Sequence, residues 1–240
     1  MKRAAARVLI VGVGGIGCPA AIALARSGVG SIGLCDEDFV DETNLHRQIL
    51  FCAADVGEPK LAVAAREVRR IAPGAAVQLH RTRLLPDNAV EIVRNYDVVL
   101  EGSDNFATKF LACDACLIAG VPVVHASAVQ WIGTVLAAGA AGRPCYRCIF
   151  EDIPEGGGPG CADAGVMGPV VGMIAAMQVD LGLCMLDGAS VEGQLVTFDG
   201  RCDSLRRHTV ASRGDCALCG PERSIHSVES AVYGFPEYAG

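Results

Sequence analysis

The chain has 240 residues, 51% of them hydrophobic and 20% charged, so it is long enough to bury a sizeable core and too apolar to be disordered. Its 20 Lys and Arg against 27 Asp and Glu give a formal charge of −7, which argues against a surface built to bind nucleic-acid phosphates. Glycine, with 29 residues, and cysteine, with 12, are the two abundant residue types that need explaining.

The first residues do not have the pattern of a secretory signal. Residues 1–7 are short and basic and lead directly into an apolar run, with no small-residue cleavage site after a long hydrophobic stretch. We therefore expect a cytoplasmic protein, in which thiols stay reduced and paired cysteines indicate metal binding or catalysis more often than disulfides.

Strand and helix signals alternate through the first 127 residues. We predict strands at 8–11, 31–34, 77–80, 97–100 and 121–125, and helices at 19–27, 60–71, 87–94 and 107–118. These strands are apolar throughout, which is typical of a sheet covered on both faces. The predicted fold class is therefore α/β, with a Rossmann-like sheet and helices on both faces.

The pattern changes in the second half of the chain. Strands are predicted at 129–136 and 194–198 without a strand–helix–strand rhythm between them, so we expect the sheet to be mixed, with antiparallel members added. The acidic, Gly/Pro-rich residues 151–160 predict a mobile loop.

Residues 166–186 are apolar over about the length of a membrane span. Pro169, Asp180 and several glycines interrupt this stretch, and no basic residues flank it closely. We therefore expect a buried helix and no association with a membrane.

A glycine-rich turn follows the first predicted strand. Its glycines are Gly12, Gly14, Gly15 and Gly17, and Asp36 closes the next strand. Such glycines allow a tight turn and close backbone approach to a ligand, the following helix N-terminus favours phosphate, and the carboxylate accepts hydrogen bonds from ribose hydroxyls. The motif predicts nucleotide binding without saying which nucleotide.

Further polar residues follow the strands of this half. They are Asp38, Asn44, Arg47, Gln48, Lys60, Ser103, Asp104 and Asn105. Because ligands bind at the carboxyl ends of such strands, we expect Arg47 and Lys60 to balance charge on a triphosphate and Asp104 to hold a magnesium ion. The alternative makes the two cations solvated surface charges, and Asp104–Asn105 a turn with a helix N-cap.

Two C-x-x-C pairs predict a metal site. Cys145, Cys148, Cys216 and Cys219 suit a closed tetrahedral zinc site with a structural role, which would tether a C-terminal appendage to the main body. The third pair, Cys113 and Cys116, lies in a helical pattern, and we interpret both residues as core or surface thiols.

Cys161 ends the predicted mobile loop, close to the start of the apolar helix. There it suits a nucleophile or sulfur acceptor, although position alone equally fits an incidental exposed thiol. The remaining cysteines are interpreted as small apolar or incidental residues: Cys18, Cys35, Cys52, Cys184 and Cys202.

Together these motifs resemble the ThiF/HesA/MoeB family of ubiquitin-activating-type adenylyltransferases, and its ThiF branch most. The resemblance covers residues 7–220 and rests on VLIVGVGGIGCPAA, NLHRQILF, GEPK, SDN, CYRC with CALCG, and GCADAGVMGPVVG. It implies a homodimer that uses ATP and magnesium to adenylate the C-terminal Gly-Gly tail of a ubiquitin-like sulfur-carrier protein. The pathway would make thiamine, molybdopterin or a related cofactor, with a cysteine desulfurase or rhodanese-like protein as sulfur donor.

The resemblance also implies roles for matching residues. Asp36 would bind ribose, Arg47 and Lys60 would stabilise the phosphates, Asp104 would ligate magnesium, and Cys161 would bond to the carrier during sulfur transfer. The whole chain would be a single adenylation domain with a nucleotide-binding half (1–127), a carrier-binding half (128–200) whose mobile loop spans 151–165, and the C-terminal appendage (201–240).

One family feature is missing from its usual place. Members begin with a helix whose Arg reaches into the partner subunit's site, and neither Arg3 nor Arg7 lies in that motif. A scaffold without activity, and adenylation of another peptide or side-chain carboxylate, therefore stay open. An NAD-dependent oxidoreductase is a further alternative, for which His125 is the candidate base.

Overall fold

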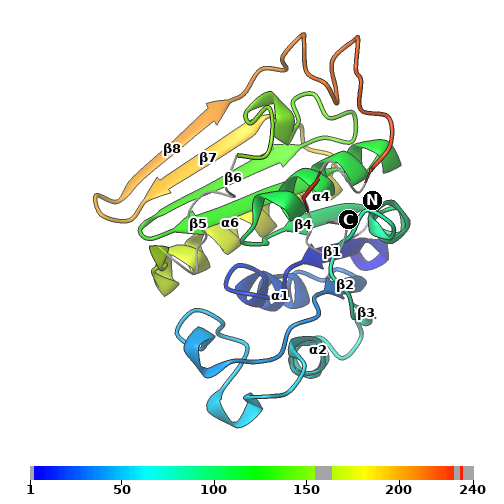
Figure 1. The fold of residues 1–240 in the computed structure, drawn as a ribbon. Helices are drawn as coiled ribbons and strands as arrows, with labels where there is room; N and C mark the ends of the chain where they lie inside the picture. The colour runs from blue at the N-terminus through cyan, green and yellow to red at the C-terminus, as the bar shows by residue number, and fades with distance from the viewer. Residues whose placement is uncertain (1–2, 155–163, 230–232, 235–240) are drawn as a thin grey trace.

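The computed structural model describes residues 3–154, 164–229 and 233–234 and contains one eight-stranded sheet (Figure 1). The strand order is β3-β2-β1-β4-β5-β6-β7-β8. The strands are β1 (Arg7–Val11), β2 (Ser31–Cys35), β3 (Ala76–His80), β4 (Val98–Glu101), β5 (Val123–Val129), β6 (Ile132–Ala138), β7 (Gln194–Asp199) and β8 (Ser204–Thr209). β1 to β5 pair in parallel, and β6, β7 and β8 extend the sheet antiparallel, so the predicted mixed sheet is confirmed.

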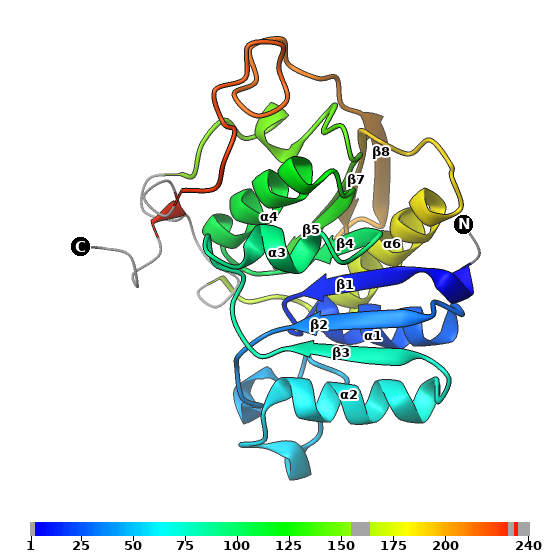
Figure 2. The ribbon, with the colours of Figure 1, turned by 90° about the vertical axis from the view of Figure 1, so that its right-hand side faces the viewer.

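Helices cover both faces of the sheet (Figure 2). They are α1 (Gly17–Arg26), α2 (Lys60–Ile71), α3 (Ala89–Val93), α4 (Phe106–Ala119) and α6 (Gly168–Leu186), with short 3-10 turns η1 (Arg3–Ala5), η2 (Glu42–Asn44), η3 (Ala53–Asp55) and η4 (Tyr146–Cys148). One core contains residues of α1, α2 and α6, and the other contains residues of α3, α4 and the C-x-x-C segments.

The apolar strands supply both cores. Along β1, Val8 and Ile10 join the first core, whereas Leu9 and Val11 join the second. Because successive side chains of a strand point to opposite faces, a strand that is apolar throughout must be covered on both sides. This explains why the sequence pattern predicted the layers of the fold.

The second half of the sheet differs in detail from the prediction. β5 continues to Val129, and β6 begins at Ile132 after a turn at Gln130, whose φ is 52°. β8 was not predicted, because its residues are mostly exposed and carry no apolar alternation. Residues 204–209 therefore belong to the main sheet, although we had assigned them to the appendage.

α6 packs against β4, β5, β6 and β7. Among the described residues it is the one helix long and apolar enough to cross a membrane by length and composition alone. Its Gln178 is 1% exposed and donates from Nε2 to the carbonyls of Glu101 and Val124, each at 2.8 Å. As predicted, the helix covers the core, and through Gln178 it bridges the neighbouring strands β4 and β5.

Candidate functional site

A cavity of about 510 Å³ opens at the carboxyl edge of the parallel strands. Parallel strands all end at the same edge, so loops distant in sequence meet there. Eleven of the predicted ligand-binding or neighbouring residues line it: Gly12, Gly14, Gly15, Asp36, Asp38, Arg47, Gln48, Lys60, Ser103, Asp104 and Asn105. Its size is within the range of small-molecule sites.

The glycine-rich turn has the geometry that its sequence predicted. Gly12 has a φ of 84°, a conformation that other residues rarely adopt. A Cβ on Gly17 would lie 2.0 Å from the carbonyl oxygen of Gly12, so the first turn of α1 can pack against the loop only with glycine there. Gly17 thus shapes the turn and does not itself line the cavity.

Asp36 fixes the same turn. Its Oδ2 accepts a hydrogen bond from the backbone N–H of Val13 at 2.7 Å, and its Oδ1 accepts from the N–H of Asp38 at 2.8 Å. The carboxylate therefore holds the end of β2 against the glycine loop while it borders the cavity.

The two predicted cations reach the cavity from different segments. Lys60, at the start of α2, is 5% exposed, and its Nζ lies 2.8 Å from Asp38 Oδ2. Arg47 donates from Nη2 to Asn44 Oδ1 at 2.5 Å. Asn44 does not itself line the cavity. Its hydrogen bond to Arg47 orients the guanidinium group.

Gln48 brings a buried hydrogen-bond acceptor to the wall of the cavity. The residue is 4% exposed, and its buried Oε1 has no hydrogen-bond partner among the described residues. A buried polar atom without a partner is costly, which indicates that a ligand or water completes the site.

The loop after β4 supplies a further carboxylate to the cavity wall. Asp104 lines it, and Asn105 both lines it and caps α4, since its Oδ1 accepts from the N–H of Thr108 at 2.8 Å. Asn105 is therefore a helix cap that also borders the cavity, and its role in ligand binding stays a prediction.

A buried charged cluster beneath this loop was not predicted. It consists of Glu101, Lys109 and His125, which are 0%, 4% and 2% exposed. His125 does not line the cavity, so it is not placed as the base that a hydride-transfer site would need. Burial lowers its pKa, and the neighbouring Glu101 opposes this shift without reversing it.

The burial of His125 predicts a dependence of stability on pH. Its folded-state pKa lies below 6.5, so below that pH the unfolded chain binds more protons than the folded one. Its contribution is therefore fully present above pH 6.5 and falls on acidification, by at most about 1.4 kcal/mol per pH unit. Urea unfolding at pH values from 8 to 5.5 should show that the free energy of unfolding of His125→Gln changes less with pH than that of the unaltered protein.

The matched control is His208→Gln, because His208 is exposed on β8. His208→Gln should keep the slope of the unaltered protein. Equal slopes for His125→Gln and the unaltered protein would contradict a neutral, buried imidazole.

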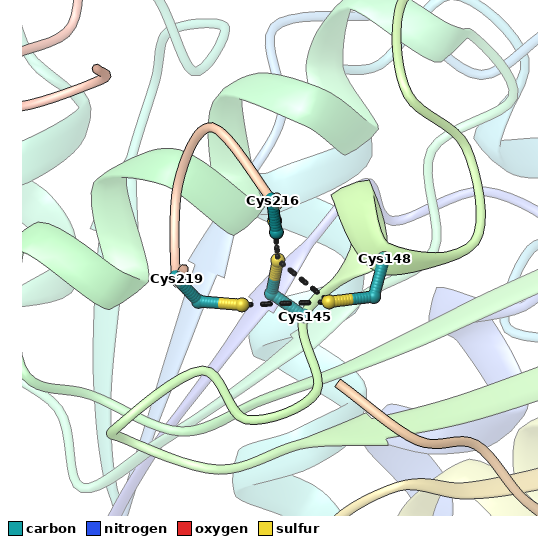
Figure 3. A group of neighbouring side chains, drawn as sticks. All are labelled: Cys145, Cys148, Cys216 and Cys219. Atoms are coloured by element: carbon teal, nitrogen blue, oxygen red, sulfur yellow. Dashed lines mark hydrogen bonds between the residues drawn. The ribbon is translucent and has the colours of Figure 1, made fainter. Parts of the chain in front are cut away.

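The four predicted zinc ligands come together (Figure 3). Their sulfur atoms all lie within 4.8 Å of one another, with Cys145–Cys216 at 3.6 Å, Cys148–Cys219 at 3.4 Å and Cys145–Cys148 at 3.9 Å. A tetrahedral ion with Zn–S bonds of about 2.3 Å places sulfurs about 3.8 Å apart. The donor set and its spacing fit such an ion, with no open position left for a substrate.

Cys113 lies beside this cluster. Its Sγ accepts a hydrogen bond from the N–H of Tyr146 at 3.3 Å, and the residue is 2% exposed, as is Cys116 at 0%. Both are core thiols, in line with the prediction, and Cys113 also supports the C-x-x-C segment.

Tyr233, near the end of the chain, lies in the same region. Arg147 forms two hydrogen bonds with the fully buried Asp114, at 2.9 and 2.8 Å, and Tyr233 donates to Asp114 Oδ2 at 2.8 Å. The next residue, Gly234, lines the cavity. No role was predicted for these residues, and the hydrogen bond to Asp114 attaches Tyr233 to α4.

The remaining cysteines carry no comparable cluster among the described residues. Cys18 and Cys35 are buried, and burial raises the pKa of each thiol to about 12, so both stay protonated. Cys52 and Cys202 are exposed, and Cys184 is half-buried. Cys161 lies outside the described residues, and its proposed reactivity stays a prediction.

Comparisons with known proteins agree with this geometry. A model described as the ThiF family matches residues 2–218. The adenylyltransferase and sulfurtransferase MOCS3 of Bos taurus is 40% identical over 237 residues, covering 95% of this chain and 51% of its own. The sulfur carrier protein adenylyltransferase of Thermus thermophilus is 38% identical over 231 residues, covering 92% of this chain and 84% of its own.

Solved structures share the fold. The structure of E. coli MccB with ATP has a TM-score of 0.78 at 23% identity, covering 91% of this chain and 68% of that one. The chain spans about half the length of several curated relatives that it matches, including two at 51% and 52%.

Proposed function

The chain belongs to the ThiF family, and from that premise we propose that it adenylates the C-terminal glycine carboxylate of a ubiquitin-like sulfur-carrier protein. The observation that carries the proposal is the meeting of Arg47, Lys60 and Asp104 around the glycine loop in one cavity. The name of the Thermus thermophilus relative, and the share of that relative which the chain covers, support the same substrate class.

The proposed reaction is an in-line exchange at the α-phosphate of ATP. A carboxylate oxygen of the carrier forms a bond to that phosphorus, the bond to the bridging oxygen of the β-phosphate breaks, and pyrophosphate leaves with the electron pair. Negative charge grows on the phosphate oxygens, and groups fixed in advance stabilise it most effectively.

Residues around the cavity could bind the ribose, the phosphates and the magnesium ion that this step requires. The backbone N–H groups of Gly14 and Gly15, which line the cavity ahead of α1, would bind the phosphates, and Asp36, which borders the cavity, would accept a hydrogen bond from a ribose hydroxyl. Lys60 and Arg47 supply positive charge, and Lys60 would exchange part of its contact with Asp38 for a phosphate. Asp104 would hold a magnesium ion, which would supply positive charge to the phosphates.

We propose a structural role for zinc at Cys145, Cys148, Cys216 and Cys219. The four thiolates leave no position for substrate, and they join the segment after β6 to the segment after β8. Zinc would then fix Tyr146 and Arg147, which lie between two of its ligands.

The remaining parts of the proposal concern context. They are a homodimer, a location in the cytoplasm, a cysteine desulfurase or rhodanese-like sulfur donor, and a role of Cys161 in sulfur transfer for a thiamine, molybdopterin or related pathway. The family resemblance of the sequence supports them.

ATP–pyrophosphate exchange tests the function. Purified protein with Mg²⁺, ATP, labelled pyrophosphate and a panel of carriers ending in Gly-Gly should exchange label only when a matching carrier is present. The matched control is the same carrier without its last glycine, which should support no exchange. No exchange with any carrier would refute the proposal, and exchange with unrelated peptides would favour adenylation of another carboxylate.

A further inference from the structure

Glu101 lies directly beneath the loop that carries Asp104. It is the last residue of β4 and is 0% exposed. Its Oε1 accepts hydrogen bonds from the backbone N–H of Ser103, at 2.7 Å, and from the Ser103 hydroxyl. The carboxylate therefore holds Ser103, at the start of the loop, through two hydrogen bonds.

The other carboxylate oxygen is fixed by two different elements. Lys109 of α4 donates from Nζ to Oε2 at 2.9 Å, and His125 of β5 places Nδ1 3.1 Å from the same oxygen. Lys109 Nζ also donates to the carbonyl of Ala126 at 2.6 Å. Burial raises the pKa of Glu101, but Lys109, His125 and Ser103 outweigh it and hold the pKa at about 2, so the carboxylate stays ionised.

The surroundings of the cluster leave it little freedom. The rings of His125 and Tyr146 lie 4.8 Å apart between centroids, which supports the imidazole from the C-x-x-C segment. Gln178 of α6 binds the carbonyl of Glu101. The carboxylate is thus held by Ser103, α4 and β5, while α6 binds the backbone carbonyl of the same residue.

Asp104 stands between two residues that this arrangement fixes. Ser103 is bound to Glu101 on one side, and Asn105 caps α4 on the other. A buried charge costs free energy unless it is fully paired, and a hydrophobic cluster of similar volume is often at least as stabilising. Stability alone therefore does not account for a charged cluster beneath this one loop.

We propose that Glu101 is a positioning residue for Asp104, and that its carboxylate, oriented by Lys109 and His125, holds the loop so that Asp104 can ligate the magnesium of bound ATP. The inference rests on the proposed function for the magnesium and the ATP, but the holding of the loop does not. Residues that orient a metal ligand typically change metal affinity about 10- to 100-fold when replaced.

The test compares Glu101→Gln with the double variant Glu101→Gln/Lys109→Met in the full chain. The double variant removes both buried charges, which avoids leaving Lys109 unpaired. The matched control is Asp55→Asn, because Asp55 is a 6% exposed carboxylate that binds Cys52 and Arg66 and lies outside the cavity. Calorimetry measures ATP binding in EDTA and over a Mg²⁺ titration, and amide exchange by mass spectrometry follows residues 99–106.

We expect the double variant to need about 10- to 100-fold more Mg²⁺ for half-maximal enhancement of ATP binding, while binding in EDTA changes little. Asp104→Asn should show the same loss, and adding it to the double variant should cause no further loss, because both changes remove one interaction. The Ser103 amide should exchange about tenfold faster in the double variant. Asp55→Asn should match the unaltered protein in each measurement.

An unaltered Mg²⁺ requirement in a folded double variant would overturn the proposal, as would losses that add to those of Asp104→Asn. Failure of the unaltered protein to bind ATP would instead refute the proposed function. The exchange rate at Ser103 would then still decide the structural half: unchanged exchange overturns it, and faster exchange supports it.

Discussion

Lys60→Ala is expected to lower carrier-dependent pyrophosphate exchange by about 100- to 1,000-fold, the usual cost of removing one group that stabilises a developing anionic charge. Lys60 is buried at the start of α2, and its ammonium group is fixed beside the cavity by Asp38. The loss should fall mainly on kcat, because the charge it balances grows as pyrophosphate departs. Steady-state exchange over a range of ATP concentrations separates kcat from KM.

Arg66→Ala provides the matched control for this prediction. Arg66 lies on the same helix but pairs with Asp55 and Glu58 outside the cavity. Arg66→Ala loses one positive charge, as Lys60→Ala does, but it should retain pyrophosphate exchange. Both variants should show the far-UV circular dichroism of the unaltered protein. Equal exchange rates for Lys60→Ala and Arg66→Ala would remove Lys60 from the reaction.

Cys216→Ser is expected to abolish zinc binding and to lower the melting temperature by about 10 °C. Three thiolates cannot close the tetrahedral shell, and the segment that follows β8 loses its attachment to the segment that follows β6. For a chain of this size, a loss of about 4 kcal/mol corresponds to a shift of about 10 °C. Native mass spectrometry should change from about one zinc ion per chain to none.

The control is Cys202→Ser, since Cys202 is exposed and lies outside the four-cysteine cluster. This variant should keep its zinc and its melting temperature. Zinc content that is unaffected by Cys216→Ser would contradict the assignment.

The features that the sequence revealed are those encoded by neighbouring residues. The glycine turn, Asp36 and the two C-x-x-C pairs each form a short pattern whose geometry follows from residue type, and the apolar strands indicated a sheet covered on both faces. Lys60 and Arg47 were located because the strands of a parallel sheet end at one edge. In these cases local pattern and tertiary structure point to the same arrangement.

The features that it missed depend on contacts between distant segments. Tyr233 binds Asp114, 119 residues away, and Arg147 binds the same carboxylate across 33 residues. Glu101 and His125 are 24 residues apart and resemble ordinary strand residues until β4 and β5 pair. No spacing rule connects such partners, because their proximity is a product of the sheet order.

The strand β8 ends the sheet order, so one of its sides offers backbone N–H and C=O groups that no described strand pairs with. Such an edge invites strands of other molecules, and proteins commonly protect it with charge. Arg206 and Arg207 are exposed there, next to the apolar Leu205, which is also exposed. Repulsion between these arginines on two copies would oppose the edge-to-edge pairing of two sheets.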